Sequence, residues 1–342
     1  RGIFNTFRKI IKIMLKKFDC QWLVNDPKAL FSLGNIWIKS EKHAKGLNIQ
    51  GKALRNWVQT NQEFPHNLED FISLMGKYQR QEECHGHLCH LELNSKLFKP
   101  YLAYSYFQIG DQARAKQLME DYVKYQTPED NKLPFIMYLS WKLELIKISE
   151  LFLFKDGLNS TFDGRFWKAK MCLKLEKFTL AMECIVKLAC QCQYYVKSNN
   201  FFTERIANRL NTLVSILDTC LGQVADFQVP SNMKKIKRKM ESLVAKYRSH
   251  KRSMQYLVTS LCLKLVTQII EKSTSLNLHP EYHFNVFKAF THNGMFDEAL
   301  KEHEAMESAL KNVKSQSYRD ILEYKTHSVS SYDALQCLYR YR

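Results

Sequence analysis

The sequence predicts an all-α protein, folded as an irregular α-solenoid of antiparallel helical hairpins. The chain has only 11 Gly and 7 Pro in 342 residues, below the roughly 7% and 5% of average proteins. This scarcity disfavours a turn-rich all-β domain or a glycine-looped nucleotide enzyme. Apolar residues recur at intervals of three and four, which gives an α-helix one buried face. Hydrophobic residues make up 45% of the chain, enough for a folded core.

The first element is a basic amphipathic helix over residues 1–20. Residues 1–18 hold six basic residues and no acid, and the apolar face carries Ile3, Phe4, Phe7, Ile10, Ile11, Met14, Leu15 and Phe18. Three interpretations remain: a targeting or membrane-surface helix, a helix laid on RNA, or a core helix with a solvated basic side. The chain does not begin with Met, so either a leader was cleaved or the first residues are missing. A cleaved leader would indicate an organelle.

Three later segments each predict a helix, a tight turn and a second helix. They are Tyr101–Tyr125, Phe166–Cys190 and Tyr282–Leu310. The first and third turns contain a glycine, which relieves the left-handed backbone that ends a helix. The second has a polar break at Glu176 and Lys177 instead. A small residue follows each turn at the same offset of five and allows the helices to approach closely: Ala115, Ala181 and Ala299.

These hairpins resemble the tetratricopeptide and pentatricopeptide repeat families, whose units are stacked helical hairpins. The pentatricopeptide type is matched best by FNVFKAFTHNGMFDEALKEHEAM. The tetratricopeptide type is closer to YLAYSYFQIGDQARAKQLMEDYV and FWKAKMCLKLEKFTLAMECIVKLA. The turns at Gly110, Glu176 and Gly294 are not evenly spaced, so the predicted array is irregular. Without a tandem run, the base-by-base RNA code of pentatricopeptide repeats is not expected.

Two other stretches predict single long helices, Leu133–Phe154 and Asn200–Leu221. The clearest linker is residues 226–231, which include Pro230. The expected organisation has three parts. They are a basic N-terminal helix (1–20), a helical-hairpin array (21–229), and a region with a basic helix and pentatricopeptide-like hairpins (230–342).

A second basic block follows Pro230. The chain has 51 Lys and Arg against 34 Asp and Glu, for a net charge of +17. Residues 234–252 hold nine basic residues and one acid, Glu241. A helix here would bury a narrow apolar stripe and project its lysines to solvent. Clustered cations release counterions when they bind a polyanion, so nucleic acid or an anionic membrane is the expected partner. The alternative is an ordinary solvated or charge-paired helix face.

The RNA-contacting residues are predicted from both basic blocks. They are Arg8, Lys9, Lys12, Lys16, Lys17, Lys234, Lys235, Lys237, Arg238, Lys239, Lys246, Arg248, Lys251 and Arg252. Such side chains would contact phosphates and fix the position of the RNA without reading its bases.

Catalytic and metal chemistry is not expected. The sequence lacks GxxxxGK[ST], a GxGxxG after a strand, HExxH and GxSxG. The segment CHGHLCH offers Cys84, His85, His87, Cys89 and His90. Seven contiguous residues rarely wrap a zinc ion, so a polar helix start or loop is favoured. Cys190 and Cys192 are interpreted as packing residues. Ten cysteines in so long a chain indicate a reducing compartment, and no apolar run is long enough to span a membrane.

The predicted function is a non-enzymatic scaffold that binds RNA and neighbouring proteins, without cofactor or small-molecule substrate. Pentatricopeptide-like proteins typically serve organellar RNA, so the resemblance implies a structural subunit of the mitochondrial ribosome, located in the matrix. The alternative is a protein-only scaffold or assembly factor of a mitochondrial membrane complex, whose basic helices would bind acidic lipids.

Overall fold

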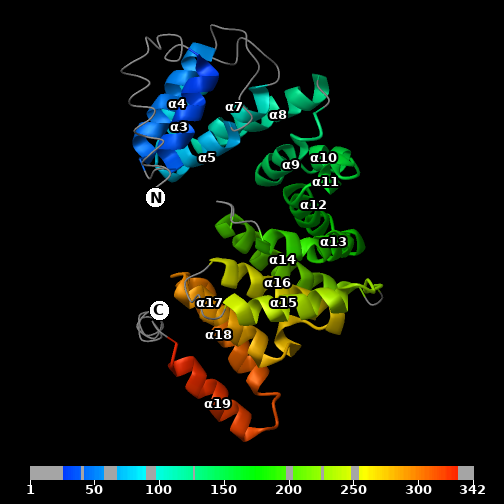
Figure 1. Ribbon diagram of the computed structural model, residues 1–342. Helices are drawn as coiled ribbons and strands as arrows, with labels where there is room; N and C mark the ends of the chain where they lie inside the picture. The colour runs from blue at the N-terminus through cyan, green and yellow to red at the C-terminus, as the bar shows by residue number, and fades with distance from the viewer. Residues whose placement is uncertain are drawn as a thin grey trace. The chain divides into compact units, whose positions relative to one another are not determined.

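The protein is helical throughout the part of the chain that the computed structural model describes. That part consists of residues 26–39, 42–57, 68–89, 98–125, 128–197, 203–224, 227–247 and 254–329. All regular secondary structure in these ranges is helical, α-helix except for short 3-10 segments (Figure 1). The all-α prediction is therefore confirmed. The helix predicted for residues 1–20 lies outside the described residues.

The chain divides into two compact units, residues 1–155 and 156–342. Within the described ranges, the first contains four helix pairs joined by short connections, each pair in contact. Its helices are α3 (Pro27–Lys39), α4 (His43–Trp57), α5 (Leu68–Lys77), α6 (Gln81–Cys89), α7 (Lys99–Gln108), α8 (Gln112–Tyr125), α9 (Leu133–Lys142) and α10 (Ile146–Phe152). The backbones of α3 and α4 approach each other closely. A Cβ atom added to Gly34 would lie only 2.8 Å from the Gly46 carbonyl oxygen, so glycine is required there.

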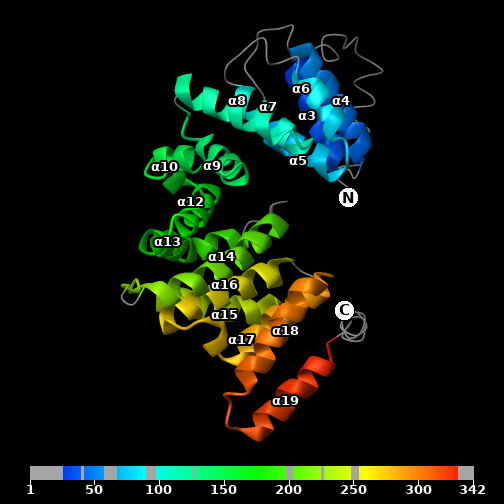
Figure 2. The ribbon, with the colours of Figure 1, turned by 180° about the vertical axis from the view of Figure 1, so that it is seen from behind.

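The second unit is built around one buried helix, α16. Its helices are α11 (Gly157–Ser160), α12 (Phe162–Lys174), α13 (Phe178–Lys197), α14 (Thr203–Gln223), α15 (Met233–Tyr247), α16 (Met254–Glu271), the 3-10 helix η2 (Ser275–Asn277), α17 (Pro280–His292), α18 (Phe296–Leu310) and α19 (Gln316–His327). All side chains of α16 from Tyr256 to Ile269 are buried. Helices α13, α14, α15 and α17 all pack against it (Figure 2).

The linker at residues 226–231 does not separate two folded parts. Helices α13 and α14 precede it, and both pack against helices that follow it. The division between the compact units lies instead between Lys155 and Asp156. Composition indicated Pro230 as a boundary, but a proline-containing turn inside a packed helical layer has the same local composition.

Five hairpins share one turn. A residue with positive φ ends the first helix, and the next N–H donates to a carbonyl five residues back, as Asp111 does to Tyr106 at 2.9 Å. This is the Schellman arrangement, which satisfies helix-terminal carbonyls. The positive-φ residues are Gln79, Gly110, Glu144, Glu176 and Gly294. Five positions after each one lies a fully buried small residue: Cys84, Ala115, Ser149, Ala181 and Ala299. The three predicted hairpins are confirmed, with two additional ones.

The prediction of one long helix over Leu133–Phe154 is wrong. The segment is itself a hairpin, α9 and α10, which turns at Glu144 with φ of 60°. This turn contains no glycine, so the local composition does not show that the run of apolar residues is divided between two helices. The turns at Gln79, Gly110, Glu144 and Glu176 are 31, 34 and 32 residues apart. This spacing is close to a tetratricopeptide repeat length, and the irregularity falls after Glu176.

Replacing Glu176 with glycine is expected to stabilise the second unit. Glu176 adopts a φ of 56°, a conformation that costs a residue with a Cβ roughly 1–2 kcal/mol. Glycine reaches it without this penalty but loses more chain entropy on folding, so we expect a net gain of about 0.5–1 kcal/mol. Urea denaturation measures the change. Glu183→Gly in the middle of α13 is the matched control, and it should destabilise by about 1 kcal/mol.

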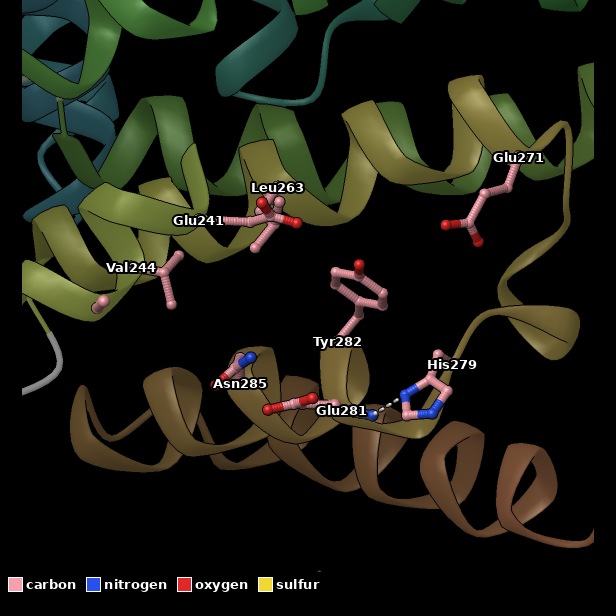
Figure 3. A pocket seen from close by; sticks show the side chains of 9 residues that line it. Glu241, Val244, Leu263, Glu271, His279, Glu281, Tyr282 and Asn285 are labelled. Carbon is pink, nitrogen blue, oxygen red and sulfur yellow. Dashed lines mark hydrogen bonds between the residues drawn. The ribbon is translucent and has the colours of Figure 1, made fainter. Parts of the chain in front are cut away.

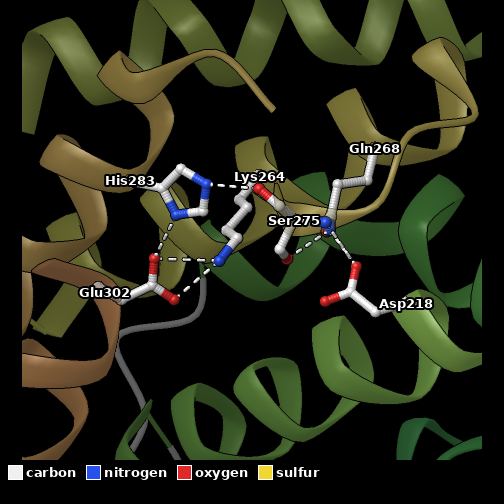
Figure 4. A network of polar contacts seen from close by, with 6 residues as sticks. All are labelled: Asp218, Lys264, Gln268, Ser275, His283 and Glu302. Carbon is white, nitrogen blue, oxygen red and sulfur yellow. Dashed lines mark hydrogen bonds and ion pairs between the residues drawn. The ribbon is translucent and has the colours of Figure 1, made fainter. Parts of the chain in front are cut away.

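A buried network of charged side chains ties α16 to the hairpin α17–α18 (Figure 4). The Lys264 ammonium donates to both carboxylate oxygens of Glu302, at 2.8 and 3.0 Å. His283 lies 2.9 Å from the same carboxylate through Nδ1, and 2.8 Å from the carbonyl oxygen of Ser275 through Nε2. The Ser275 carbonyl oxygen can only accept, so the Nε2 atom of His283 donates to it.

The network continues to α14 through Asp218. Its Oδ1 accepts from Gln268 Nε2 at 2.7 Å and from the backbone N–H of Ser275 at 2.9 Å. Lys264 and His283 thus share one connected network with two carboxylates. The pairing of Lys264 with Glu302 stabilises both charges inside the fold, because buried charges are stable only when paired and hydrogen-bonded. It also fixes α16, the helix on which the basic helix α15 rests.

Candidate nucleic-acid interface

The basic block that begins at residue 234 forms helix α15, as the sequence predicted. The helix starts after a turn in which the Met233 N–H donates to the Pro230 carbonyl at 3.0 Å. One face is buried, mainly against α16, and it consists of Met233, Ile236, Met240 and Val244. Leu243 and Tyr247, at the edges of the predicted stripe, are half-buried. The apolar stripe sets the orientation of the helix and turns the opposite face outward.

Five cations of α15 are exposed: Lys234, Lys235, Arg238, Lys239 and Lys246. Lys235, Lys239 and Lys246 are spaced four and seven residues apart, so they follow one line along the helix. At a rise of 1.5 Å per residue, that line is roughly 16 Å long. Among the described residues, Lys234, Lys235 and Arg238 have no ion-pair partner. The outer face of α15 therefore presents a row of exposed cations, and the uncompensated charge within the described chain lies on Lys234, Lys235 and Arg238.

Lys237 differs from its neighbours. Its ammonium lies 3.1 Å from Glu271 Oε1 on α16 and 5.5 Å from the ring centroid of Tyr282 on α17. Burial by itself lowers the pKa of Lys237, but the hydrogen bonds to Tyr282 and Glu271 outweigh burial and raise that pKa above its ordinary value. The sequence predicted that Lys237 projects to solvent with the other lysines. The structure places it inside an ion pair on the flank of the helix.

The remaining predicted RNA contacts fall outside the described residues. These are Arg8, Lys9, Lys12, Lys16 and Lys17 of the N-terminal block and Arg248, Lys251 and Arg252 after α15. Their assignment stays a prediction. The described interface is therefore α15 alone, with six cations and one acid, Glu241.

The Cys/His segment forms most of helix α6, and its side chains are engaged with one another and with neighbours. His85 Nδ1 lies 2.9 Å from Ser105 Oγ, while Cys89 Sγ lies 3.1 Å from His85 Nε2. His87 accepts from Arg55 at 3.0 Å, and burial followed by the charge of Arg55 lowers the pKa of this imidazole. His90 is not among the described residues. Across the described ranges, no three His, Cys, Asp or Glu side chains are grouped to hold a metal ion.

The other cysteines of the described chain pack as small apolar residues. Cys192 is buried, and its thiol lies 3.6 Å from the Leu188 carbonyl. Burial raises the pKa of Cys172 to about 12 and that of Cys220 to about 11. Thiols with such pKa values are poor nucleophiles and poor metal ligands at neutral pH. The packing interpretation of Cys190 and Cys192 fits this environment, although Cys190 is only half-buried.

Comparisons with known proteins give matches among solved structures. No family model matches the chain, and no curated protein matches it. Among solved structures, a chain from a structure described as Naa15/Naa10 bound to HypK-THB is similar at 12% identity and a TM-score of 0.26. The match covers 85% of this chain and 54% of that chain, so this chain spans about half the length of its match.

None of the helices in the described ranges combines the length and apolar character needed to cross a membrane.

Proposed function

We propose that this protein is a non-enzymatic, RNA-associated scaffold that contacts RNA phosphates through helix α15. The observation that supports it most is the row of exposed cations on the outer face of α15, three of them without an ion-pair partner in the described chain. Clustered lysine and arginine bind nucleic acid mainly through phosphates, with the release of condensed counterions. The buried stripe below holds these cations on a rigid support.

The helical hairpins are proposed to hold this surface in place and to contact neighbouring proteins. The setting follows from the resemblance of the hairpins to pentatricopeptide repeats, which typically serve organellar RNA. We therefore propose a structural subunit of the mitochondrial ribosome in the matrix. Recovery of the native complex from mitochondria tests this assignment, because ribosomal RNA should co-purify with the protein.

The salt dependence of RNA binding tests the contact itself. With labelled single-stranded RNA, we expect log K to fall linearly with log salt concentration. Each phosphate contact contributes a slope of about −0.7 on single strands, so the five exposed cations of α15 predict a slope of about −3.5 or steeper. Fluorescence anisotropy at several salt concentrations measures it. RNA binding that is absent or insensitive to salt would contradict the proposal.

Anionic vesicles provide the second arm of this test. If the protein bound vesicles of phosphatidylcholine and phosphatidylglycerol but not RNA, the basic helix would belong to a scaffold at a membrane surface. Polybasic segments contribute about 1 kcal/mol per residue at such a surface. That result would replace the RNA proposal with the membrane-complex alternative.

A further inference from the structure

A cavity lies on the flank of α15 that carries Glu241 and Ala245, away from the line of Lys235, Lys239 and Lys246. The exposed cations Lys234 and Arg238 lie seven and three residues before Glu241, on the same side of the helix but outside the lining. The cavity has a volume of about 440 Å³ and is formed by α15, α16 and the start of α17 (Figure 3). Its lining includes Glu241, Glu271, Glu281, Tyr282, Val244 and Leu263. Helix α15 is the most basic helix described, yet the cavity beside it is lined by acids. Phosphate binding to α15 does not use this cavity.

The three carboxylates come from three different helices. Glu241 lies on α15, Glu271 ends α16 and Glu281 lies in the first turn of α17. In the part of the chain that is described, Glu241 and Glu281 make no ion pair, while Glu271 pairs with Lys237. The lining thus holds three carboxylates and one histidine, His279, with the cation Lys237 at its edge. Within the lining itself, this arrangement favours a positively charged group over phosphate.

The Tyr282 ring projects into the same space (Figure 3). The cation Lys237 already lies 5.5 Å from the centroid of this ring while it pairs with Glu271. This corner of the cavity therefore shows the arrangement by which a side-chain cation is bound, an aromatic face and a carboxylate together. Glu241 and Glu281 provide further carboxylates without an internal cation.

The floor of the cavity is apolar. Val244 and Leu263 are both buried and line its base. An apolar floor below charged walls suits a long basic side chain, whose methylene stem packs on apolar surface while its charged group stays at the rim. A metal ion or a simple ammonium ion would gain nothing from this floor.

We propose that this cavity is the docking pocket for an arginine side chain on a basic segment of a partner protein. Arginine fits better than lysine, because its planar guanidinium stacks on an aromatic ring and pairs with a carboxylate through two parallel hydrogen bonds. The two flanks of α15 then have different partners, RNA on the row of cations and a basic protein segment in the acidic cavity. The pocket is independent of the RNA proposal and stands if that proposal fails.

Titration with a capped tetra-arginine peptide carrying a rhodamine label tests the pocket by fluorescence anisotropy. We expect saturable binding to the full chain, weaker binding of tetra-lysine, and none of the neutral citrulline peptide. The double variant Glu241→Gln, Glu281→Gln should weaken tetra-arginine at least tenfold, and Tyr282→Leu should weaken it several-fold. Equal binding of the lysine and arginine peptides, or binding of the citrulline peptide, would overturn the proposal.

A matched control separates the pocket from general charge attraction. Glu304→Gln with Glu323→Gln removes two exposed acids on α18 and α19, which do not line the cavity. This variant should bind tetra-arginine within about twofold of the native chain. If it weakened binding as much as the pocket variant, diffuse charge would be responsible and the pocket assignment would be wrong.

A third variant introduces an arginine into the lining, so that its side chain occupies the cavity in place of the peptide. Ala245 is exposed and lines the cavity, so Ala245→Arg is expected to fold normally and to block the peptide. RNA affinity of all pocket variants should stay the same or rise slightly, since they add or leave positive charge. Loss of peptide binding with RNA binding retained therefore distinguishes this pocket from the RNA surface. Unimpaired peptide binding by Ala245→Arg would refute it.

Discussion

Replacing Glu302 with alanine is expected to lower the free energy of unfolding of the native protein by about 3–5 kcal/mol. Removal of one member of a buried ion pair leaves an uncompensated charge, and the cost is of that size. Here two groups lose their partner, because the Glu302 carboxylate accepts from Lys264 at 2.8 Å and lies 2.9 Å from His283. Both are almost fully buried. Urea denaturation followed by circular dichroism gives the change.

The control for this variant lies two residues along the same helix. Glu304 is exposed on α18, so Glu304→Ala should change stability by no more than about 0.5 kcal/mol. Similar losses in both variants would mean that helix α18 tolerates no substitution, rather than that the buried network matters. A loss below about 1 kcal/mol for Glu302→Ala would show that the network is not required.

Acid titration gives a second measurement of the same network. Burial raises the pKa of Glu302, but Lys264 and His283 together outweigh it and hold that pKa below its ordinary value of 4.5. A carboxyl with a lowered pKa contributes stability at higher pH, and this contribution is lost as the pH falls below about 4.5 through the folded-state pKa. Glu302→Gln should therefore flatten the fall in stability in this acidic range. If Glu302→Gln lost stability at acidic pH as steeply as the native protein, Glu302 would not be the group responsible.

Hairpins could be predicted from the sequence where their turns contain glycine or, at Glu176 and Lys177, a polar break in the apolar pattern. Gly110 and Gly294 both have positive φ, and the small residue five positions later was visible in each. At Glu144 the same backbone is imposed by tertiary packing on a residue that does not favour it. The turn was missed there because local composition gives no sign of a left-handed residue other than glycine or asparagine. The buried Ser149, at the same offset, was the remaining signal.

The candidate interface could be predicted to the level of the helix but not of each side chain. Periodicity identified the buried stripe and hence the outward face of α15. It could not reveal that Lys237 meets Glu271, 34 residues away, since such a pairing depends on how α15 packs on α16. For the same reason, Glu241 appeared only as an isolated acid in a basic block, although the fold places it with Glu271 and Glu281 around one cavity. Lys264, a lysine inside the apolar run of α16, was the visible sign of the buried network.

Reversal of four exposed cations on α15 is expected to reduce RNA affinity at least 100-fold. The variant carries Lys234→Glu, Lys235→Glu, Arg238→Glu and Lys239→Glu, and it leaves Lys237 in its ion pair with Glu271. Each lost phosphate contact should reduce the salt slope by about 0.7 on single-stranded RNA, which gives a reduction of about 3 in all. The fold should persist, because these side chains are exposed. Acids at the first helical turn also interact favourably with the helix dipole.

The matched control changes the net charge by the same amount away from α15. Lys301, Lys311, Lys314 and Lys325 are exposed in the same unit, on α18, α19 and the connection between them. Their replacement by glutamate should leave the salt slope within about 0.5 of the native value, because charges far from the contact are screened beyond about 8 Å at physiological ionic strength. If the control variant lost affinity and slope as strongly as the α15 variant, the attraction would depend on total charge. The row of cations would then have no specific role in RNA binding.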